Sequence, residues 1–239
     1  MRVRNRVSAC LLAVASVTLA GCGDDAVKGH PTTAMDSFAP SEDNQDPAKD
    51  IPGVVTAAYP LGNHVPSTQR VAYTSIPPMG GTHDAVWAAC DGVVYPEGIR
   101  TENAVHSMEH GAVWIAYDPA RVSADDQATL RNKVQGRTYT FMSPIPNMAD
   151  PISLQSWGHQ LVPDSATDAR VDQFITALRN NPYTTPEPGA SCSNPIFDRD
   201  PAPYDPSAPG LDAAPMNNEP VFPTEVPVLP PEPDVPAPR

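Results

Sequence analysis

The centre of the chain reads Ala112-Val113-Trp114-Ile115-Ala116-Tyr117, a short apolar run rich in β-forming residues that ends at Asp118-Pro119. An apolar run of this length beside turn residues predicts a buried β-strand. We therefore expect the core of a folded domain to lie around this segment.

A helix is predicted directly after this strand. Ser123 can cap its first turn, in which Asp125 and Asp126 would interact favourably with the helix dipole. The helix is expected to run to about Gln135, because Gly136 can end it.

Two further strands and a second helix complete the pattern. Residues 137–142 and 152–162 are rich in β-formers and are predicted as strands. The final helix is expected over about residues 168–180. It has one apolar face with the spacing i, i+3, i+4 and i+7, formed by Val171, Phe174, Ile175 and Leu178.

This order of elements indicates an α+β fold, a small mixed sheet with two helices packed on it. Residues 54–103 are rich in Pro and Gly, so the N-terminal half of the domain is expected to be loop-rich. A thioredoxin-like arrangement also fits this order, although the chain has no Cys-x-x-Cys motif to support that chemistry.

The N-terminus has the order of a secretory signal. Three arginines in the first six residues precede an apolar stretch over residues 7–20, which is too short to span a bilayer. It ends in Leu19-Ala20-Gly21-Cys22, a lipobox in which the Cys22 thiol would accept a diacylglyceryl group. We expect a signal peptide over residues 1–21 and a lipoprotein anchored to the outer face of the cell membrane. An ordinary cleaved signal with a chance cysteine is the alternative.

The remaining chain divides into a tether, a domain and a tail. Residues 22–52 are polar and acidic without periodicity, which predicts a lipidated N-terminus followed by a flexible tether. Residues 194–239 are Pro-rich, which predicts a disordered or polyproline-like tail. A single folded domain is left over residues 53–193.

The charge of the chain bears on its partners. Removal of residues 1–21 takes away three arginines and no acidic residue, so the formal net charge goes from −13 to −16. Nucleic-acid binding needs clustered Lys and Arg, so we expect no nucleic-acid partner. The lipid is the only membrane contact that the sequence offers.

Two cysteines, Cys90 and Cys192, remain beyond the signal and Cys22. Leftover thiols outside the cytoplasm usually pair, so a disulfide is expected. It would close a loop of about a hundred residues, worth on the order of 4 kcal/mol in the chain-entropy treatment. Metal ligation by one or both cysteines is the alternative.

Histidines are the strongest candidates for chemistry. His106 and His110 lie four residues apart, on one face of a helix or a strand, and His64 and His83 lie upstream. Neutral imidazoles bind transition metals, so these four residues predict a copper or zinc site whose ligands Glu109 would orient. Histidines that only cap loops or bond carbonyl groups are the alternative.

The segment 106–110 also spells His-x-x-Glu-His, the inverted zinc-peptidase signature, with Glu109 as the base. Those enzymes carry the motif inside a long helix, whereas here Gly111 follows at once. The Met108 side chain points to another face than the histidines and is expected in the core. There is no Gly-x-Ser-x-Gly motif and no phosphate loop, so no catalytic residue is assigned.

The chain resembles a bacterial family known as domain of unknown function 3105 over about residues 60–193. The resemblance rests on short motifs: His64-Val65, Pro77-Pro78-Met79-Gly80-Gly81-Thr82-His83, Trp87, Cys90, Gly92-Val93-Val94-Tyr95, Ala104-Val105-His106-Ser107-Met108-Glu109-His110-Gly111, Ser143-Pro144, Trp157-Gly158 and Pro186-Glu187-Pro188-Gly189-Ala190-Ser191-Cys192. The family occurs in secreted or membrane-anchored proteins and has no established activity. The resemblance therefore implies location and domain limits rather than chemistry. Met108 and His159 depart from the family pattern.

Three functions compete at this point. The first is an extracytoplasmic lipoprotein that binds copper or zinc through its histidine cluster. The second is a non-catalytic envelope module with structural histidines, whose Pro-rich tail binds an envelope protein. The third is a metal-dependent hydrolase that uses Glu109. Convergence of the four imidazoles would favour the first of these.

Overall fold

Strand β6 (Val113–Tyr117) lies inside the sheet, at the apolar run that predicted a buried strand, and all five of its residues are buried. The structure is a computed structural model that describes residues 35–217. The predicted signal peptide, Cys22 and the part of the predicted tail beyond residue 217 lie outside the described residues. Within residues 35–217, no helix is long and apolar enough to cross a membrane.

The main sheet has six strands. β6 pairs in parallel with β7 (Thr140–Pro144) and antiparallel with β8 (Ile152–Ser156). The outer strands are β5 (Asp91–Val94) beside β7, β9 (His159–Leu161) beside β8, and β1 (Val55–Thr56) beyond β9. The order β1-β9-β8-β6-β7-β5 is a mixed sheet, which confirms the predicted α+β class.

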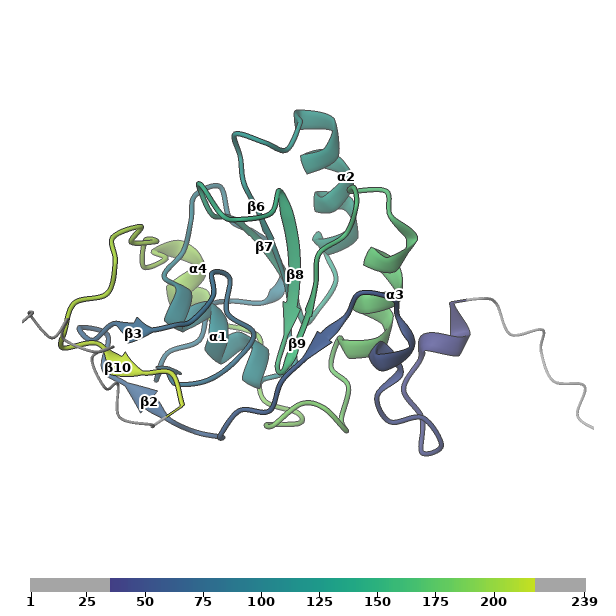
Figure 1. Ribbon diagram of the computed structural model, residues 1–239, viewed down its shortest axis with the longest axis horizontal. Helices are drawn as coiled ribbons and strands as arrows, with labels where there is room; N and C mark the ends of the chain where they lie inside the picture. Colours follow the sequence, from purple (N-terminus) through teal and green to yellow (C-terminus); the bar gives the residue numbers. More distant parts are fainter. Residues whose placement is uncertain (1–34, 218–239) are drawn as a thin grey trace, which may run out of the picture. The chain divides into compact units, whose positions relative to one another are not determined.

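Helices α2 (Ala124–Val134) and α3 (Ala169–Leu178) cover one face of this sheet (Figure 1). α2 begins at the predicted cap, where the Ser123 hydroxyl accepts a hydrogen bond from the Asp126 amide at 3.1 Å. It connects β6 to its parallel neighbour β7, as a crossover helix does. The predicted apolar face of α3 is buried in the same core, through Val171, Phe174, Ile175 and Leu178.

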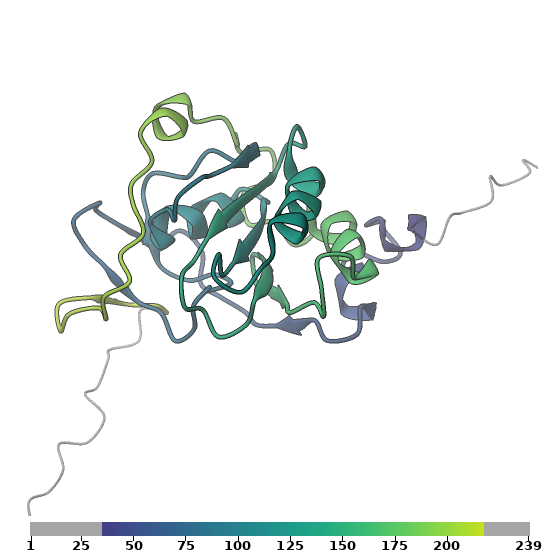
Figure 2. The same ribbon diagram turned by 90° about the horizontal axis from the view of Figure 1, so that it is seen from above.

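Helix α1 (Thr101–Glu109) lies on the opposite face, and all nine of its residues are buried. Its apolar side chains pack with Trp114 and Phe141 of the sheet. Figure 2, seen from above, shows the sheet between α1 and the pair α2 and α3. Two small parallel sheets lie on the α1 side: β2 (His64–Val65) with β4 (His83–Asp84), and β3 (Val71–Ala72) with β10 (Ala214–Pro215).

The folded part begins before the predicted domain limit. The 3₁₀ helices η1 (Asp36–Phe38) and η2 (Pro47–Asp50) pack against α3, and Ala48 and Ile51 belong to the core shared with α2 and α3. The structure therefore differs from the predicted flexible tether over residues 35–52. Pro47, Ala48 and Ile51 are buried, which is enough to dock this largely exposed acidic segment against the core.

The folded part also extends beyond residue 193. Helix α4 (Pro195–Arg199) buries Phe197, and residues 200–217 then run along the α1 side as a C-terminal strap. Strap carbonyl groups accept hydrogen bonds from the main domain, for example Ala202 from the Arg100 amide at 2.7 Å. Proline removes amide donors but leaves carbonyl acceptors, so a Pro-rich segment can still dock in an extended form.

Two local expectations differ from the structure. The strand predicted over residues 152–162 is a hairpin, β8 and β9, because Gly158 turns the chain with a φ of 72°. A Cβ at this position would lie 2.6 Å from the Ala57 carbonyl oxygen, so glycine is required there. Helix α1 was not predicted as an element, because its outward face is covered by the small sheets and carries polar residues.

Candidate metal centre

Two histidines meet because β2 and β4 pair in parallel. The register places His64 directly beside His83, and their ring centroids lie 4.8 Å apart. The His83 side chain is completely buried, whereas 39 % of the His64 side chain is exposed. The pair therefore reaches from the interior to the surface.

Helix α1 brings two more candidate ligands to this pair. His106 and Glu109 are three residues apart and so share one face of the helix. The His106 ring stacks on His64 at 5.0 Å and lies 4.8 Å from His83 between centroids. One nitrogen or oxygen from each of the four residues lies within 4.8 Å of the other three. We call His64, His83, His106 and Glu109 the inner group.

Main-chain carbonyl groups set the orientation of two imidazoles. His83 Nδ1 lies 2.7 Å from the Gly81 carbonyl oxygen, and His106 Nδ1 lies 2.7 Å from that of Asp84. A carbonyl oxygen only accepts, so Nδ1 must be the donor in both rings. In the neutral rings, Nε2 therefore carries the lone pair that a metal ion needs.

The carboxylate of Glu109 faces these lone pairs in a buried position. Its Oε1 accepts a hydrogen bond from the Gly62 amide at 2.9 Å. Its Oε2 lies 2.8 Å from His83 Nε2 and 3.8 Å from His64 Nε2. A proton on His83 Nε2 makes this close contact an ion pair. A metal ion bound by both atoms is the other way to satisfy these two buried groups.

Electrostatics keep two of these ligands ready for a metal. Burial lowers the pKa of His106 to about 4, helped by the neighbouring imidazoles and opposed by its bond to the Asp84 carbonyl. Burial alone would raise the pKa of Glu109, but His83, the Gly62 amide and His106 outweigh it and lower that pKa to about 2. At neutral pH, His106 is therefore uncharged and Glu109 is ionised, which are the forms that bind metal.

Comparison with known proteins adds one finding. A family described as Protein of unknown function (DUF3105) matches residues 64–194, more than half of the chain. The chain belongs to this family. No curated protein and no solved structure matches it significantly. The matched residues include the whole inner group, both cysteines of the predicted disulfide, and His110.

The DUF3105 domain brings together three of the four predicted histidine ligands. His110 lies beside His106, with 4.6 Å between ring centroids, but it falls in a different group with His106 and Glu187. Glu109 occupies the fourth place of the inner group as a direct ligand candidate, where the sequence predicted only an orienting role. Glu187 was missed, although it lies in the Pro-Glu-Pro-Gly segment that carried part of the family resemblance.

The two cysteines and Met108 lie where the sequence predicted. Cys90 and Cys192 form a disulfide in the structure, so neither thiol serves as a metal ligand. Met108 is fully buried among apolar residues. His159 lies outside both groups, and its Nε2 is 3.1 Å from Asp46 Oδ2.

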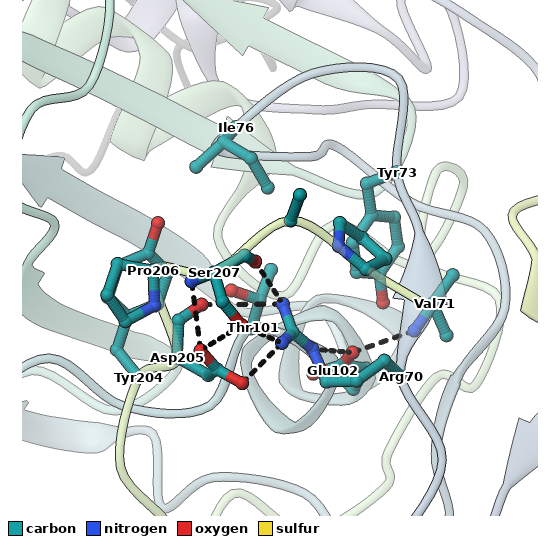
Figure 3. Close-up of a pocket in the computed structure, with 12 residues that line it drawn as sticks. Arg70, Val71, Tyr73, Ile76, Thr101, Glu102, Tyr204, Asp205, Pro206 and Ser207 are labelled. Atoms are coloured by element: carbon teal, nitrogen blue, oxygen red, sulfur yellow. Dashed lines mark hydrogen bonds and ion pairs between the residues drawn. The ribbon is translucent and has the colours of Figure 1, made fainter. Parts of the chain in front are cut away.

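A network of charged residues supports the side of α1 that carries the candidate ligands. Arg100, at the start of the helix, forms ion pairs with Asp84 on β4 and with Glu102 on α1. Arg70 continues the network to Glu102 and to Asp205 of the strap, beside a cavity of about 180 Å³ (Figure 3). These contacts hold β4, which carries His83, against α1, which carries His106.

Proposed function

We propose that the DUF3105 domain binds one transition-metal ion, zinc or copper, through Nε2 of His64, His83 and His106 and the carboxylate of Glu109. The observation that carries this proposal is the convergence of the inner group, in which one ligand atom from each of the four residues lies within 4.8 Å of the other three. A divalent cation bound there would also satisfy His83 Nε2 and Glu109 Oε2, which lie 2.8 Å apart.

The types of ligand atom narrow the choice of metal. Three imidazole nitrogens and one carboxylate oxygen suit Zn²⁺ and Cu²⁺, whereas Cu⁺ prefers thiolates and thioethers. Of the sulfur-bearing residues considered as ligands, Cys90 and Cys192 are paired in a disulfide and Met108 packs in the core. A tetrahedral ion at about 2.0–2.1 Å from each ligand separates neighbouring ligand atoms by about 3.3 Å. Small movements would bring the inner group to this spacing, since its atoms lie within 4.8 Å of one another and the His83–Glu109 pair, at 2.8 Å, need only move slightly apart.

The same geometry favours metal binding over catalysis. Four protein ligands fill a tetrahedral ion, as in structural and storage sites, and leave no position for a substrate. Glu109 would not be free to act as a base, because one oxygen holds the Gly62 amide and the other faces the histidines. We therefore propose capture or retention of a metal rather than hydrolysis.

The location is part of the proposal. The lipobox at Cys22 and the apolar stretch before it favour a lipoprotein on the outer face of the cell membrane. The Cys90–Cys192 disulfide is consistent with an oxidising compartment. His64 is partly exposed at the edge of the inner group. It would provide the entry route for a metal ion from solution.

The direct test is metal analysis of the untagged protein after dialysis against zinc or copper. We expect one ion per chain in the wild type and its loss in His106→Gln and Glu109→Gln. The matched control is His159→Gln, which removes another buried histidine that faces a carboxylate but lies outside the group. It should keep one ion. A wild type without metal, or equal metal in all four proteins, would refute the proposal.

A further inference from the structure

His110 and Glu187 are not used by the inner group, yet they form a second set of ligands around His106. The three residues each offer one ligand atom, and these atoms also lie within 4.8 Å of one another. His110 Nε2 lies 3.4 Å from Glu187 Oε2. We call His106, His110 and Glu187 the outer group.

In the outer group, as in the inner group, a main-chain carbonyl group orients an imidazole ring. His110 Nδ1 lies 2.8 Å from the Ser191 carbonyl oxygen, so Nδ1 is the donor and Nε2 points its lone pair toward Glu187. The Glu187 amide donates to the carbonyl of Glu109 at 3.1 Å, which ties this loop to the end of α1. The Trp87 ring packs 5.0 Å from His110 between centroids and covers the group on one side.

The two groups differ in exposure. Glu109, the carboxylate of the inner group, is buried, whereas 47 % of the Glu187 side chain is exposed. An ion at the outer group would therefore have fewer protein ligands and would still contact water. Such a position binds more weakly and exchanges more easily than a closed four-ligand position.

The groups cannot be filled at the same time, because they share His106. Its Nδ1 is committed to the Asp84 carbonyl, which leaves Nε2 as the only metal-binding atom for both groups. One lone pair binds one ion. We infer that His106, His110 and Glu187 form a second, surface position for the same ion, which exchanges with the inner position through the shared imidazole. This inference rests on the proposed function.

Equilibrium dialysis with Zn²⁺ can separate the two positions. The double variant His64→Ala/Glu109→Gln disables the inner group. It spares the outer one, since the glutamine side chain can still accept the Gly62 hydrogen bond and the main-chain carbonyl at this position still holds Glu187. We expect one ion per chain in the wild type and one ion in the double variant, bound at least about 100-fold more weakly. Loss of a group that merely orients a ligand already costs about 10–100-fold.

Addition of Glu187→Gln to the double variant should abolish the remaining zinc binding. The matched control adds Glu97→Gln instead, which changes an exposed glutamate on the loop between β5 and α1 and should leave that binding intact. In the otherwise wild-type protein, Glu187→Gln should slow zinc uptake in stopped-flow mixing.

Each other outcome has a definite meaning. If the wild type binds no zinc, the proposed function fails and this inference fails with it. If the wild type binds one ion but the folded double variant binds none, only the outer position is refuted. Two ions per wild-type chain would refute the sharing of His106. If uptake slows in His64→Ala but not in Glu187→Gln, the ion enters beside His64 and exchange through the outer group is wrong.

Discussion

The two faces of the main sheet are both buried but hold different kinds of core. The face under α2 and α3 is packed with apolar side chains, among them Ile115, Met142 and Phe174. The face under α1 also has an apolar layer, but beyond it the helix buries acids, an arginine and histidines: Asp84, Arg100, Glu102, His83, His106 and Glu109.

This difference separates stability from function within one domain. Apolar burial stabilises the fold, at about 25 cal/mol per Å² of buried apolar surface. Buried charges cost free energy unless they are paired, and replacing such pairs with apolar residues is often neutral or stabilising. The α1 face therefore carries groups that stability alone does not require. Arg100 and Arg70 pair Asp84 and Glu102, and the convergence of the imidazoles on Glu109 is the point at which we propose a ligand.

The largest expected effect comes from breaking the apolar face. Phe174→Ala should lower the free energy of unfolding by about 4 kcal/mol, because it deletes a fully buried ring from the core. Urea denaturation measures this loss. Zinc affinity should stay close to that of the wild type, because the ring lies in the core under α2 and α3 and not in the core under α1. The control Ile196→Ala removes a side chain that is 78 % exposed and should change stability by less than about 0.5 kcal/mol.

Opening the disulfide should have the next largest effect, on the α1 side. Cys90→Ala/Cys192→Ala releases a constraint across 102 residues of sequence, so we expect a loss of about 2–4 kcal/mol in urea denaturation. A reducing agent should lower the stability of the wild type by a similar amount and leave the double variant unchanged. Equal stability of the oxidised wild type and the variant would contradict the prediction.

A smaller effect is expected from pH. In metal-free protein, acid should lower the free energy of unfolding through the α1 face. The pKa of His106 is lowered to about 4, so between about pH 6.5 and 4 the unfolded chain binds a proton that the folded chain does not. The free energy of unfolding therefore has its full value above about pH 6.5 and decreases as the pH falls toward about 4, because folding keeps His106 neutral. The slope should approach about 1.4 kcal/mol per pH unit.

Urea denaturation in a chelator at several pH values tests this slope. His106→Gln should flatten the curve over that acid range, because it removes the titrating group. Phe174→Ala should instead lower the whole curve without changing its shape. If His106→Gln keeps the wild-type slope, another group is responsible for the acid sensitivity.

The smallest effect on the domain is expected from the lipid anchor. Cys22→Ala should abolish incorporation of labelled palmitate, because the thiol is the proposed acceptor. The same variant should leave the stability of both faces and the zinc affinity unchanged, since the family match and both groups of ligands lie at residue 64 and beyond. Equal labelling of wild type and variant would show that the lipobox prediction is wrong.

The apolar face was largely predictable from the sequence, and the α1 face was not. β6, α2 and α3 follow local rules: an apolar run, a serine cap and a stripe with helical spacing. Helix α1 breaks these rules because both of its faces are buried, one by apolar residues and one by ion pairs. No periodic pattern in the sequence predicts such a helix.

The site shows the same limit. Spacing alone suggested His106 and His110 as partners, and histidine chemistry suggested His64 and His83. The division into two groups depends on long-range pairing: the β2–β4 register for His83, and the loop before Cys192 for Glu187. Both involve contacts between segments far apart in sequence, which single-sequence reasoning does not reach.

The hydrogen bond from the Thr82 amide to the Met216 carbonyl, 2.7 Å long, sets an order of events during biogenesis. Thr82 precedes His83 directly, and the strap residue that holds it is made more than a hundred residues later. A chain still on the ribosome, or still being threaded through a translocation pore, lacks this clamp on β4. β2 and Arg100 also hold β4, but the complete set of contacts around the inner group requires residue 216 to have been made. In a chain exported as we propose, that set would be complete only after transport, so the metal would be taken up in the destination compartment.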